Sequence, residues 1–213
     1  MRFFRSGMIG LFLGLGLGNL PALASPLRIS VLGDSLVAGY GLPTQQAFPA
    51  QLEAALLRRG HEVVVDNAGV SGDTSAGGLA RLDWALANNP EIMIVELGAN
   101  DALRGLDPVA LKQNLDNILT QLKQARVVPL LAGMRAPRNL GENYYTRFDP
   151  LYPALAAKHQ LAFYPFFLDG VAGRPELNQA DGIHPNAAGV KVIVEKILPL
   201  VEDLLQKMPT ATQ

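Results

Sequence analysis

A serine, a histidine and an aspartate stand in sequence contexts that could support nucleophilic catalysis. In "VLGDS" a short apolar run, Val31 and Leu32, gives way to Gly33, Asp34 and Ser35, and a further glycine follows at Gly39. His184 lies in "DGIHPNAAG", three residues after Asp181. A serine hydroxyl becomes a nucleophile when an imidazole accepts its proton and a carboxylate holds the imidazole in the correct tautomer. The bland alternative is that Ser35 is a helix cap or turn residue and His184 an incidental loop residue.

Two further segments could donate hydrogen bonds to a developing oxyanion. The stretch "AGVSGDTSAGG" has glycines at which a backbone N–H can be offered without obstruction by a side chain. The stretch "LGAND" places the side-chain amide of Asn100 after another apolar run. An asparagine in a turn also commonly bonds its own backbone, so Asn100 alone decides little. Asp34, Asp73 and Asp101 are expected to brace their loops as hydrogen-bond acceptors.

The other two histidines are expected to be exposed and without a catalytic role, because His61 follows "RRG" and His159 stands near a helix end. A metal-dependent phosphoesterase is an alternative interpretation, since several hard oxygen and nitrogen ligands could meet at one edge. Such sites usually recruit several histidines, and only His184 is expected there. The candidate ligands are Asp34, Asn67, Asn100, Asp101, Asp181 and His184.

Strand and helix patterns alternate along the chain and position these groups. Branched, apolar runs predict strands over 27–33, 61–69, 91–98, 127–133 and 161–166. Amphipathic stretches predict helices over 48–60, 108–124, 152–160 and 186–207, and a polar, aromatic-rich stretch spans 135–148. A further helix is predicted through residues 79–89, with Thr74 and Ser75 as its caps. This alternation is typical of an α/β fold with a five-stranded parallel sheet between two helical layers. The loops after parallel strands gather at one edge, so all the candidate groups are expected at one rim.

The first 24 residues have the pattern of a secretory signal peptide. Arg2 and Arg5 precede a short apolar, glycine-containing run, and "PALA" ends in an Ala-x-Ala pattern at Ala22 and Ala24. An uncleaved membrane anchor is the alternative, although the apolar run is shorter than the roughly 20 residues of a spanning helix. Cleavage after Ala24 leaves one domain over residues 25–213 and predicts a periplasmic or secreted protein.

Charge and cysteine content exclude several function classes. Removing Arg2 and Arg5 takes the formal net charge from −1 to −3, and no basic stripe remains to bind nucleic acid or anionic lipid. The chain has no cysteine, which rules out a disulfide framework, a thiol nucleophile and a zinc–thiolate site. A dinucleotide site is also disfavoured, because Thr44 stands where the glycine fingerprint after Gly39 and Gly41 requires glycine or alanine.

The four blocks "GDSLVAGYG", "NAGVSGDTSAGG", "LGAND" and "DGIHPNAAG", in this order, resemble the SGNH (GDSL) hydrolases. Within that family the chain is similar to the bacterial periplasmic thioesterase, lysophospholipase and arylesterase group, over nearly all of residues 27–205. The resemblance implies a flavodoxin-like sandwich, a Ser35 nucleophile, a His184 base and an orienting Asp181. It also implies an oxyanion hole formed by the N–H groups of Ser35 and Gly72 and the amide of Asn100.

The resemblance further implies a small acyl ester or thioester as substrate, no cofactor and no metal, and no nucleic-acid partner. No stable membrane anchor is expected after signal cleavage, while transient contact with lipid is left open. Residues around the aromatic stretch could line an acyl groove or could pack the base of a loop. They are Leu103, Leu106, Met134, Tyr144, Tyr145 and Phe148. A non-catalytic binding protein on the same fold is a third possibility, because fold alone does not prove turnover.

Overall fold

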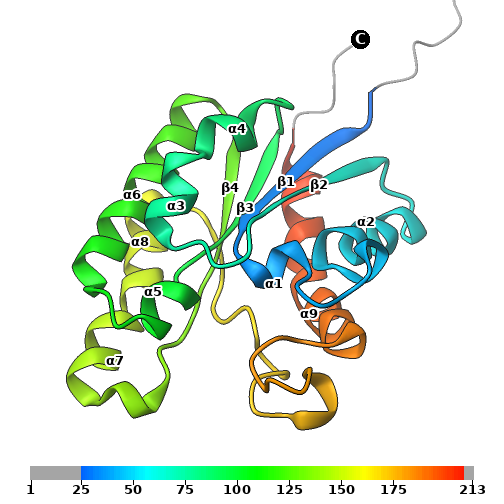
Figure 1. Ribbon diagram of the computed structural model, residues 1–213. Coiled ribbons are helices and arrows are strands. Elements are labelled where there is room, and N and C mark those ends of the chain that lie inside the picture. Colours follow the sequence, from blue (N-terminus) through cyan, green and yellow to red (C-terminus); the bar gives the residue numbers. More distant parts are fainter. Residues whose placement is uncertain (1–24, 209–213) are drawn as a thin grey trace, which may run out of the picture.

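The computed structural model describes residues 25–208, so the predicted signal peptide lies outside the described residues. Its centre is one sheet of five parallel strands in the order β2-β1-β3-β4-β5 (Figure 1). The strands are β1 (Leu27–Gly33), β2 (Val63–Gly69), β3 (Ile92–Glu96), β4 (Val128–Ala132) and β5 (Ala162–Tyr164). This order is that of flavodoxin-like sheets, with a switch point between β1 and β3. The predicted fold class is confirmed.

Helices cover both faces of the sheet and form the outer layers (Figure 1). Helices α2 and α9 pack together on one face, while α3, α6 and α8 cover the other face. The helices are α1 (Ser35–Ala38), α2 (Phe48–Arg58), α3 (Ser75–Ala80), α4 (Leu82–Leu86), α5 (Ala99–Leu103), α6 (Pro108–Gln124), α7 (Glu142–Phe148), α8 (Leu151–His159) and α9 (Ala187–Lys207). Short 3₁₀ helices lie at Thr44–Gln46 (η1), Arg138–Leu140 (η2) and Pro175–Leu177 (η3).

The core forms because the central strands are apolar on both sides. All five residues of β3 are buried, and β1 is buried from Ile29 onward. Helix α6 contributes leucines at helical spacing, including Leu111, Leu115 and Leu122, which are 0–1% exposed. At its start the Asp107 side chain accepts the N–H of Val109, and Pro108 occupies the first turn, as its sequence predicts. The sheet is therefore a rigid base for the loops that follow it.

Two segments differ from their sequence-based prediction. The helix predicted from its caps at Thr74 and Ser75 through residue 89 begins as predicted, with Thr74 as the N-cap of α3, but it breaks at Arg81 into the two short helices α3 and α4. The stretch 135–148 is partly helical, with η2 and α7, because its aromatic residues pack onto the core. Phe148 is fully buried there between the rings of Tyr144 and Tyr152.

The expectation that His159 is exposed was wrong. Its ring is buried and lies 2.6 Å from a carboxylate oxygen of Asp116 on α6. The Nζ of Lys123 also donates to the His159 carbonyl at the end of α8. The pKa of Asp116 is lowered by hydrogen bonds first from Lys158 and then from His159. This histidine therefore helps fasten α8 to α6.

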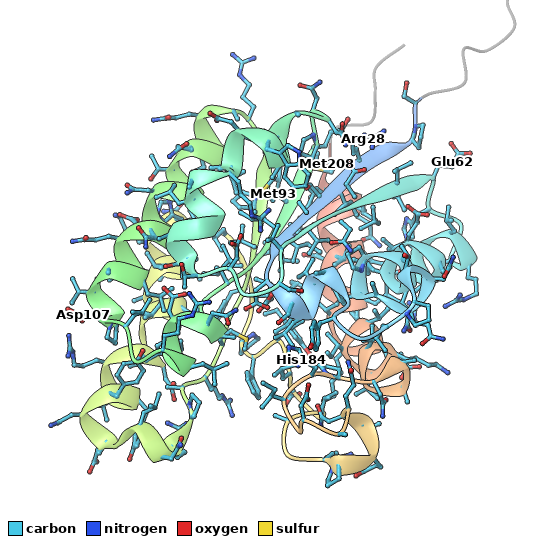
Figure 2. The ribbon with its side chains drawn as sticks, viewed as in Figure 1. Arg28, Glu62, Met93, Asp107, His184 and Met208 are labelled. Atoms are coloured by element: carbon cyan, nitrogen blue, oxygen red, sulfur yellow. The ribbon has the colours of Figure 1, made fainter. Side chains whose placement is uncertain are left out.

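The carboxyl ends of the strands meet at one edge, where α1, α5 and the segment before α9 gather (Figure 1). Figure 2 shows His184 at this edge, whereas Arg28 and Glu62 lie toward the opposite end of the sheet. Across residues 25–208, no helix is both long and apolar enough to cross a membrane.

Candidate active site

Ser35 is presented by a sharp turn from β1 into α1. Asp34 is the N-cap of α1, and its Oδ1 accepts the N–H of Leu36 at 3.0 Å. Gly33 is required by close packing, because a Cβ at this position would lie 2.3 Å from a methyl group of Val37 and 2.8 Å from Oε2 of Glu96. The strand β1 therefore places Ser35 at the edge of the sheet. Asp34 braces this turn through its hydrogen bond to Leu36, as predicted.

The structure joins Ser35, His184 and Asp181 in one series of hydrogen bonds. The His184 Nε2 lies 2.9 Å from the Ser35 Oγ, although the two residues are 149 positions apart. The His184 Nδ1 lies 2.7 Å from the Asp181 Oδ2. Because an ionised carboxylate only accepts hydrogen bonds, Nδ1–H donates to Asp181, and Nε2 can accept the Ser35 hydroxyl hydrogen.

Asp181 stays ionised in this arrangement. Its Oδ1 accepts the backbone N–H groups of His184 and Ile183 at 3.0 Å each. The N–H of His184, the His184 side chain and the N–H of Ile183, in that order, lower the pKa of Asp181 to about 2. The carboxylate is therefore available to orient the imidazole across the neutral range.

The His184 loop is held against the loop after α1. Gln179 donates from Nε2 to the carbonyl of Tyr40 at 2.7 Å, and its backbone N–H donates to the carbonyl of His184. The Tyr40 ring packs 4.7 Å from the His184 ring. Asn186 caps α9 by accepting two backbone N–H groups, and its Nδ2 donates back to Glu176. These contacts fix the direction from which the imidazole reaches Ser35.

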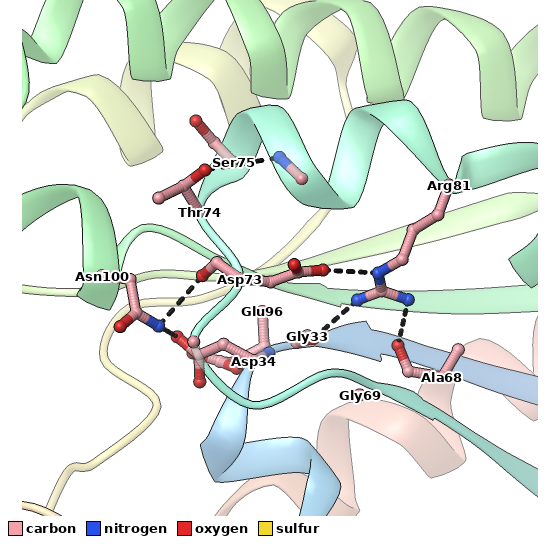
Figure 3. Close-up of polar contacts among 12 residues, drawn as sticks. Gly33, Asp34, Ala68, Gly69, Asp73, Thr74, Ser75, Arg81, Glu96 and Asn100 are labelled. Atoms are coloured by element: carbon pink, nitrogen blue, oxygen red, sulfur yellow. Dashed lines mark hydrogen bonds and ion pairs between the residues drawn. The ribbon is translucent and has the colours of Figure 1, made fainter.

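Gly72 and Asn100 lie in the loops that follow β2 and β3. Gly72 has a φ of 85°, a backbone conformation that would be strained in a residue with a side chain. Its carbonyl accepts a hydrogen bond from Arg104. Within residues 25–208 the backbone N–H groups of Gly72 and Ser35 have no hydrogen-bond partner. The Asn100 Nδ2 donates to Asp34 Oδ2 at 3.0 Å and to the Asp73 carbonyl at 2.9 Å (Figure 3).

Arg81 ties the loop after β2 to the ends of two strands (Figure 3). Its guanidinium donates to the carbonyls of Ala68 at 2.6 Å and Gly33 at 2.8 Å, and it forms an ion pair with Asp73. Asp101 similarly accepts the Ser75 hydroxyl at 2.6 Å and the Ser75 N–H at 2.8 Å. The predicted bracing roles of Asp73 and Asp101 are confirmed, whereas nothing in the sequence pattern had singled out Arg81.

A cavity of about 220 Å³ opens beside Ser35 and His184. Of the residues proposed from sequence to contact substrate, Leu103 and Met134 line it. Tyr144, Tyr145 and Phe148 do not: Phe148 is core, Tyr144 donates to the carbonyl of Leu106, and Tyr145 lies under the Arg138 guanidinium. The remaining wall includes residues that the sequence did not indicate as substrate contacts, namely Arg135, Pro137, Leu168, Ala172 and Ile183.

A signal for these missed residues was available in the sequence. Arg135 and Pro137 follow β4, and Leu168 and Ala172 follow β5, so all four occupy loops at the carboxyl edge. The aromatic residues gave the stronger sequence signal for a binding groove, but the fold packs them in or against its core. The proposed metal alternative has no geometric support: among residues 25–208, no group of three or more histidines, aspartates or glutamates is arranged to hold an ion.

A parallel α/β sheet with a serine, a histidine and an aspartate hydrogen-bonded in series at its carboxyl edge is the arrangement of serine hydrolases. Residues 31–192 match the model of the GDSL-like lipase/acylhydrolase family, and the chain belongs to this family. The predicted resemblance is thereby confirmed.

Relatives at substantial identity agree. The chain is 42% identical to the esterase TesA of Pseudomonas aeruginosa, covering 90% of this chain and 96% of the relative. It is 43% identical to the thioesterase 1/protease 1/lysophospholipase L1 of Escherichia coli K12, covering 73% and 74%. Among solved structures, AlinE4, an SGNH-hydrolase family esterase, is 46% identical with a TM-score of 0.72, covering 86% of this chain and 99% of AlinE4. The protein is a carboxylic ester hydrolase.

Proposed function

We propose that the protein hydrolyses small carboxylic esters or thioesters through a covalent acyl-serine intermediate. The observation that carries this proposal is the hydrogen-bond series from Ser35 through His184 to Asp181, with a cavity beside it. In the first step the Ser35 oxygen attacks the carbonyl carbon while His184 accepts the hydroxyl proton. His184 then protonates the leaving alcohol or thiol. Water repeats the sequence and releases the acid.

The negative oxygen of each tetrahedral intermediate is held by the backbone N–H groups of Ser35 and Gly72 and by the Asn100 amide. The first two lack partners within the described residues, which makes them free to bind the oxygen. Both Nδ2 hydrogens of Asn100 are already engaged. An oxyanion is a stronger acceptor than the neutral Asp73 carbonyl, so it can draw one of these hydrogens away. No cofactor takes part in this mechanism.

The residues that line the cavity do not select one kind of leaving group. Aryl esters, acyl thioesters and lysophospholipids all present the carbonyl that Ser35 requires. Leu103 and Met134 form an apolar part of the wall, which favours an acyl chain over a polar group. The relatives named as esterase and as thioesterase and lysophospholipase are consistent with this range. Transient contact with lipid would follow only if the substrate is a lysophospholipid.

We expect Ser35→Ala to abolish ester hydrolysis, because the nucleophilic oxygen is removed while the turn is kept. The matched control is Ser30→Ala, on the same strand, whose buried hydroxyl has no partner among the described residues. The control should keep its rate. Hydrolysis of p-nitrophenyl butyrate measures both. A serine-directed phosphonate should inactivate the wild-type enzyme and EDTA should not; substantial activity in Ser35→Ala would remove Ser35 from the proposed role.

We expect Asn100→Ala to lower kcat by about 10²–10³, the usual cost of losing one oxyanion donor. The measurement is kcat and KM on the same ester. Asn67→Ala, which changes another asparagine at the end of β2, serves as the control and should stay within about threefold. A loss of less than threefold in Asn100→Ala would leave the oxyanion to the two backbone N–H groups alone.

Substrate class is tested with p-nitrophenyl esters of two to sixteen carbons, run beside acyl-CoA and lysophospholipid. We expect a preference for chains that the apolar wall can bury, because each buried methylene contributes about 0.8 kcal/mol. Leu103→Ala should shift the optimum. An optimum that ignores this substitution would place the acyl chain elsewhere.

A periplasmic or secreted location is part of the proposal and rests on the sequence of residues 1–24. The mature protein should begin at Ser25. N-terminal sequencing of protein recovered from the periplasm or medium tests this, and a retained Met1 would contradict it.

A further inference from the structure

A buried carboxyl group lies directly beneath the Ser35 turn and has no part in the mechanism above. Glu96, the last residue of β3, is 0% exposed, and so is its neighbour Asp34. The Asp34 N–H points at Glu96 Oε2 across 3.4 Å, which is a weak contact. Glu96 Oε1 has no partner among the described residues. Figure 3 shows Glu96 beside Asp34, at the end of β1.

Two adjacent carboxyl groups shielded from water cannot both be ionised, because their charges repel and neither is hydrated. The surroundings decide which of them keeps the proton. Asp34 accepts hydrogen bonds from the Leu36 N–H and the Asn100 amide, both of which favour its ionised form. Glu96 receives only the weak contact from Asp34. An ionised Glu96 would leave a negative oxygen entirely unpartnered in the core, whereas a neutral acid leaves only a carbonyl oxygen.

We propose that Glu96 is a protonated, neutral acid whose O–H donates to the Asp34 carboxylate, and that this hydrogen bond holds Asp34 in the position from which it supports Ser35 and Asn100. Glu96 is thus a positioning residue for the proposed nucleophile and oxyanion donor. It touches neither substrate nor reacting atoms. The positioning part of the inference rests on the proposed function, whereas the protonation of Glu96 does not.

The titration behaviour of the pair agrees with this geometry. Burial, followed by the nearby Asp34 charge, raises the pKa of Glu96 well above its usual value. Burial also raises the pKa of Asp34 to about 6, against the opposing hydrogen bonds from Leu36 and Asn100. The other titratable or charged groups facing this pair from the surrounding elements are Asp101 on α5, Tyr152 on α8, His184 before α9, and Arg81 with Asp73 beyond the Gly33 carbonyl.

The sign of the pH dependence follows. When the folded state binds a proton that the unfolded state has released, the free energy of unfolding falls as the pH rises. The stabilising contribution of the Glu96 proton is present below the unfolded pKa of a glutamate. It is lost as the pH rises through the raised pKa of the folded state. A glutamine at this position donates an N–H to Asp34 at every pH and so removes this dependence.

The decisive experiment compares Glu96→Gln and Glu96→Leu with the wild-type enzyme, using Glu91→Gln as the matched control. Glu91 lies just before the same strand, where its carboxylate accepts the Arg28 N–H. Infrared spectroscopy near pH 8 should detect the C=O stretch of a protonated carboxylic acid in the wild type and in Glu91→Gln. The band should be missing from Glu96→Gln. Its absence from the wild type, or its survival in Glu96→Gln, would overturn the protonation, whatever the enzyme hydrolyses.

Kinetics test the positioning. Glu96→Gln should keep kcat within about threefold, because the donor to Asp34 is retained. Glu96→Leu, which has a similar size and no donor, should lower kcat at least about tenfold with a smaller change in KM, since a displaced nucleophile impairs the chemical step. As the pH rises, the free energy of unfolding of the wild type should fall relative to that of Glu96→Gln. Equal kcat values for Glu96→Leu and wild type would overturn the positioning role. If Glu96→Leu does not fold, the positioning role is tested with Glu96→Gln alone. A kcat reduced more than tenfold in Glu96→Gln would then overturn that role.

Discussion

The carboxylate of Asp34 is the point at which the loops of the site are joined. One of its oxygens accepts the N–H that follows Ser35, and the other accepts the amide of Asn100 from the loop after β3. Asn100 also donates to the carbonyl of Asp73 in the loop after β2. Asp34 and Asn100 together therefore connect the ends of three adjacent strands. Removing Asp34 would leave the Asn100 amide and the Leu36 N–H to find other partners in a region with little water.

The proposed ionised form of Asp34 is costly to bury, and the fold offsets the cost locally. A carboxylate that is fully shielded from solvent needs several donors to remain charged. Asp34 obtains two from the polypeptide around it, and the proposed Glu96 proton supplies a third. Arg81 also brings a positive charge close to Asp34, because its guanidinium donates to the carbonyl of Gly33, the residue before Asp34. The requirement for Gly33 is related, since a side chain there would collide first with Val37 and then with the Glu96 carboxyl. The small residue before the aspartate is thus explained by packing and not by backbone conformation.

Much of the architecture could be predicted from sequence because it depends on periodicity. Alternating strand and helix patterns imply a parallel sheet, and a parallel sheet gathers its loops at one edge. Ser35 and His184 could therefore be placed together without any knowledge of distance. Burial of individual polar residues could not be predicted in the same way. His159 was expected to be exposed because it stands at a helix end, yet the Asp116 carboxylate and the packing of α8 on α6 enclose it.

The role of the aromatic-rich stretch 135–148 was difficult to predict from sequence for a related reason. Aromatic residues such as Tyr144 and Phe148 are common in binding grooves, but they are also common in protein cores. Local sequence does not distinguish these two uses. Tertiary packing decided: Phe148 fills space next to Tyr152. The roles of Arg81 and Glu96 were equally hidden, because each depends on contacts with residues far away in the chain. Sequence patterns identify the strand ends that carry chemistry more readily than the groups that support them from behind.

The site combines parts with different freedom to change. Ser35, Gly72 and Asn100 stand directly after strands and are tied to one another through Asp34, Asp73 and Arg81, so a change in one alters the geometry of the others. The cavity wall is built differently. Arg135, Pro137, Leu168 and Ala172 come from the longer segments after β4 and β5. The second of these segments also carries Asp181 and His184, but among the described residues none of the four wall side chains hydrogen-bonds to the network around Ser35. Substitutions in the wall can therefore reshape the space for an acyl chain while the hydrogen bonds around Ser35 stay intact. On the proposed mechanism, the reacting groups come from the strand ends and from the His184 loop, while the space for the substrate is shaped by neighbouring side chains that can change separately.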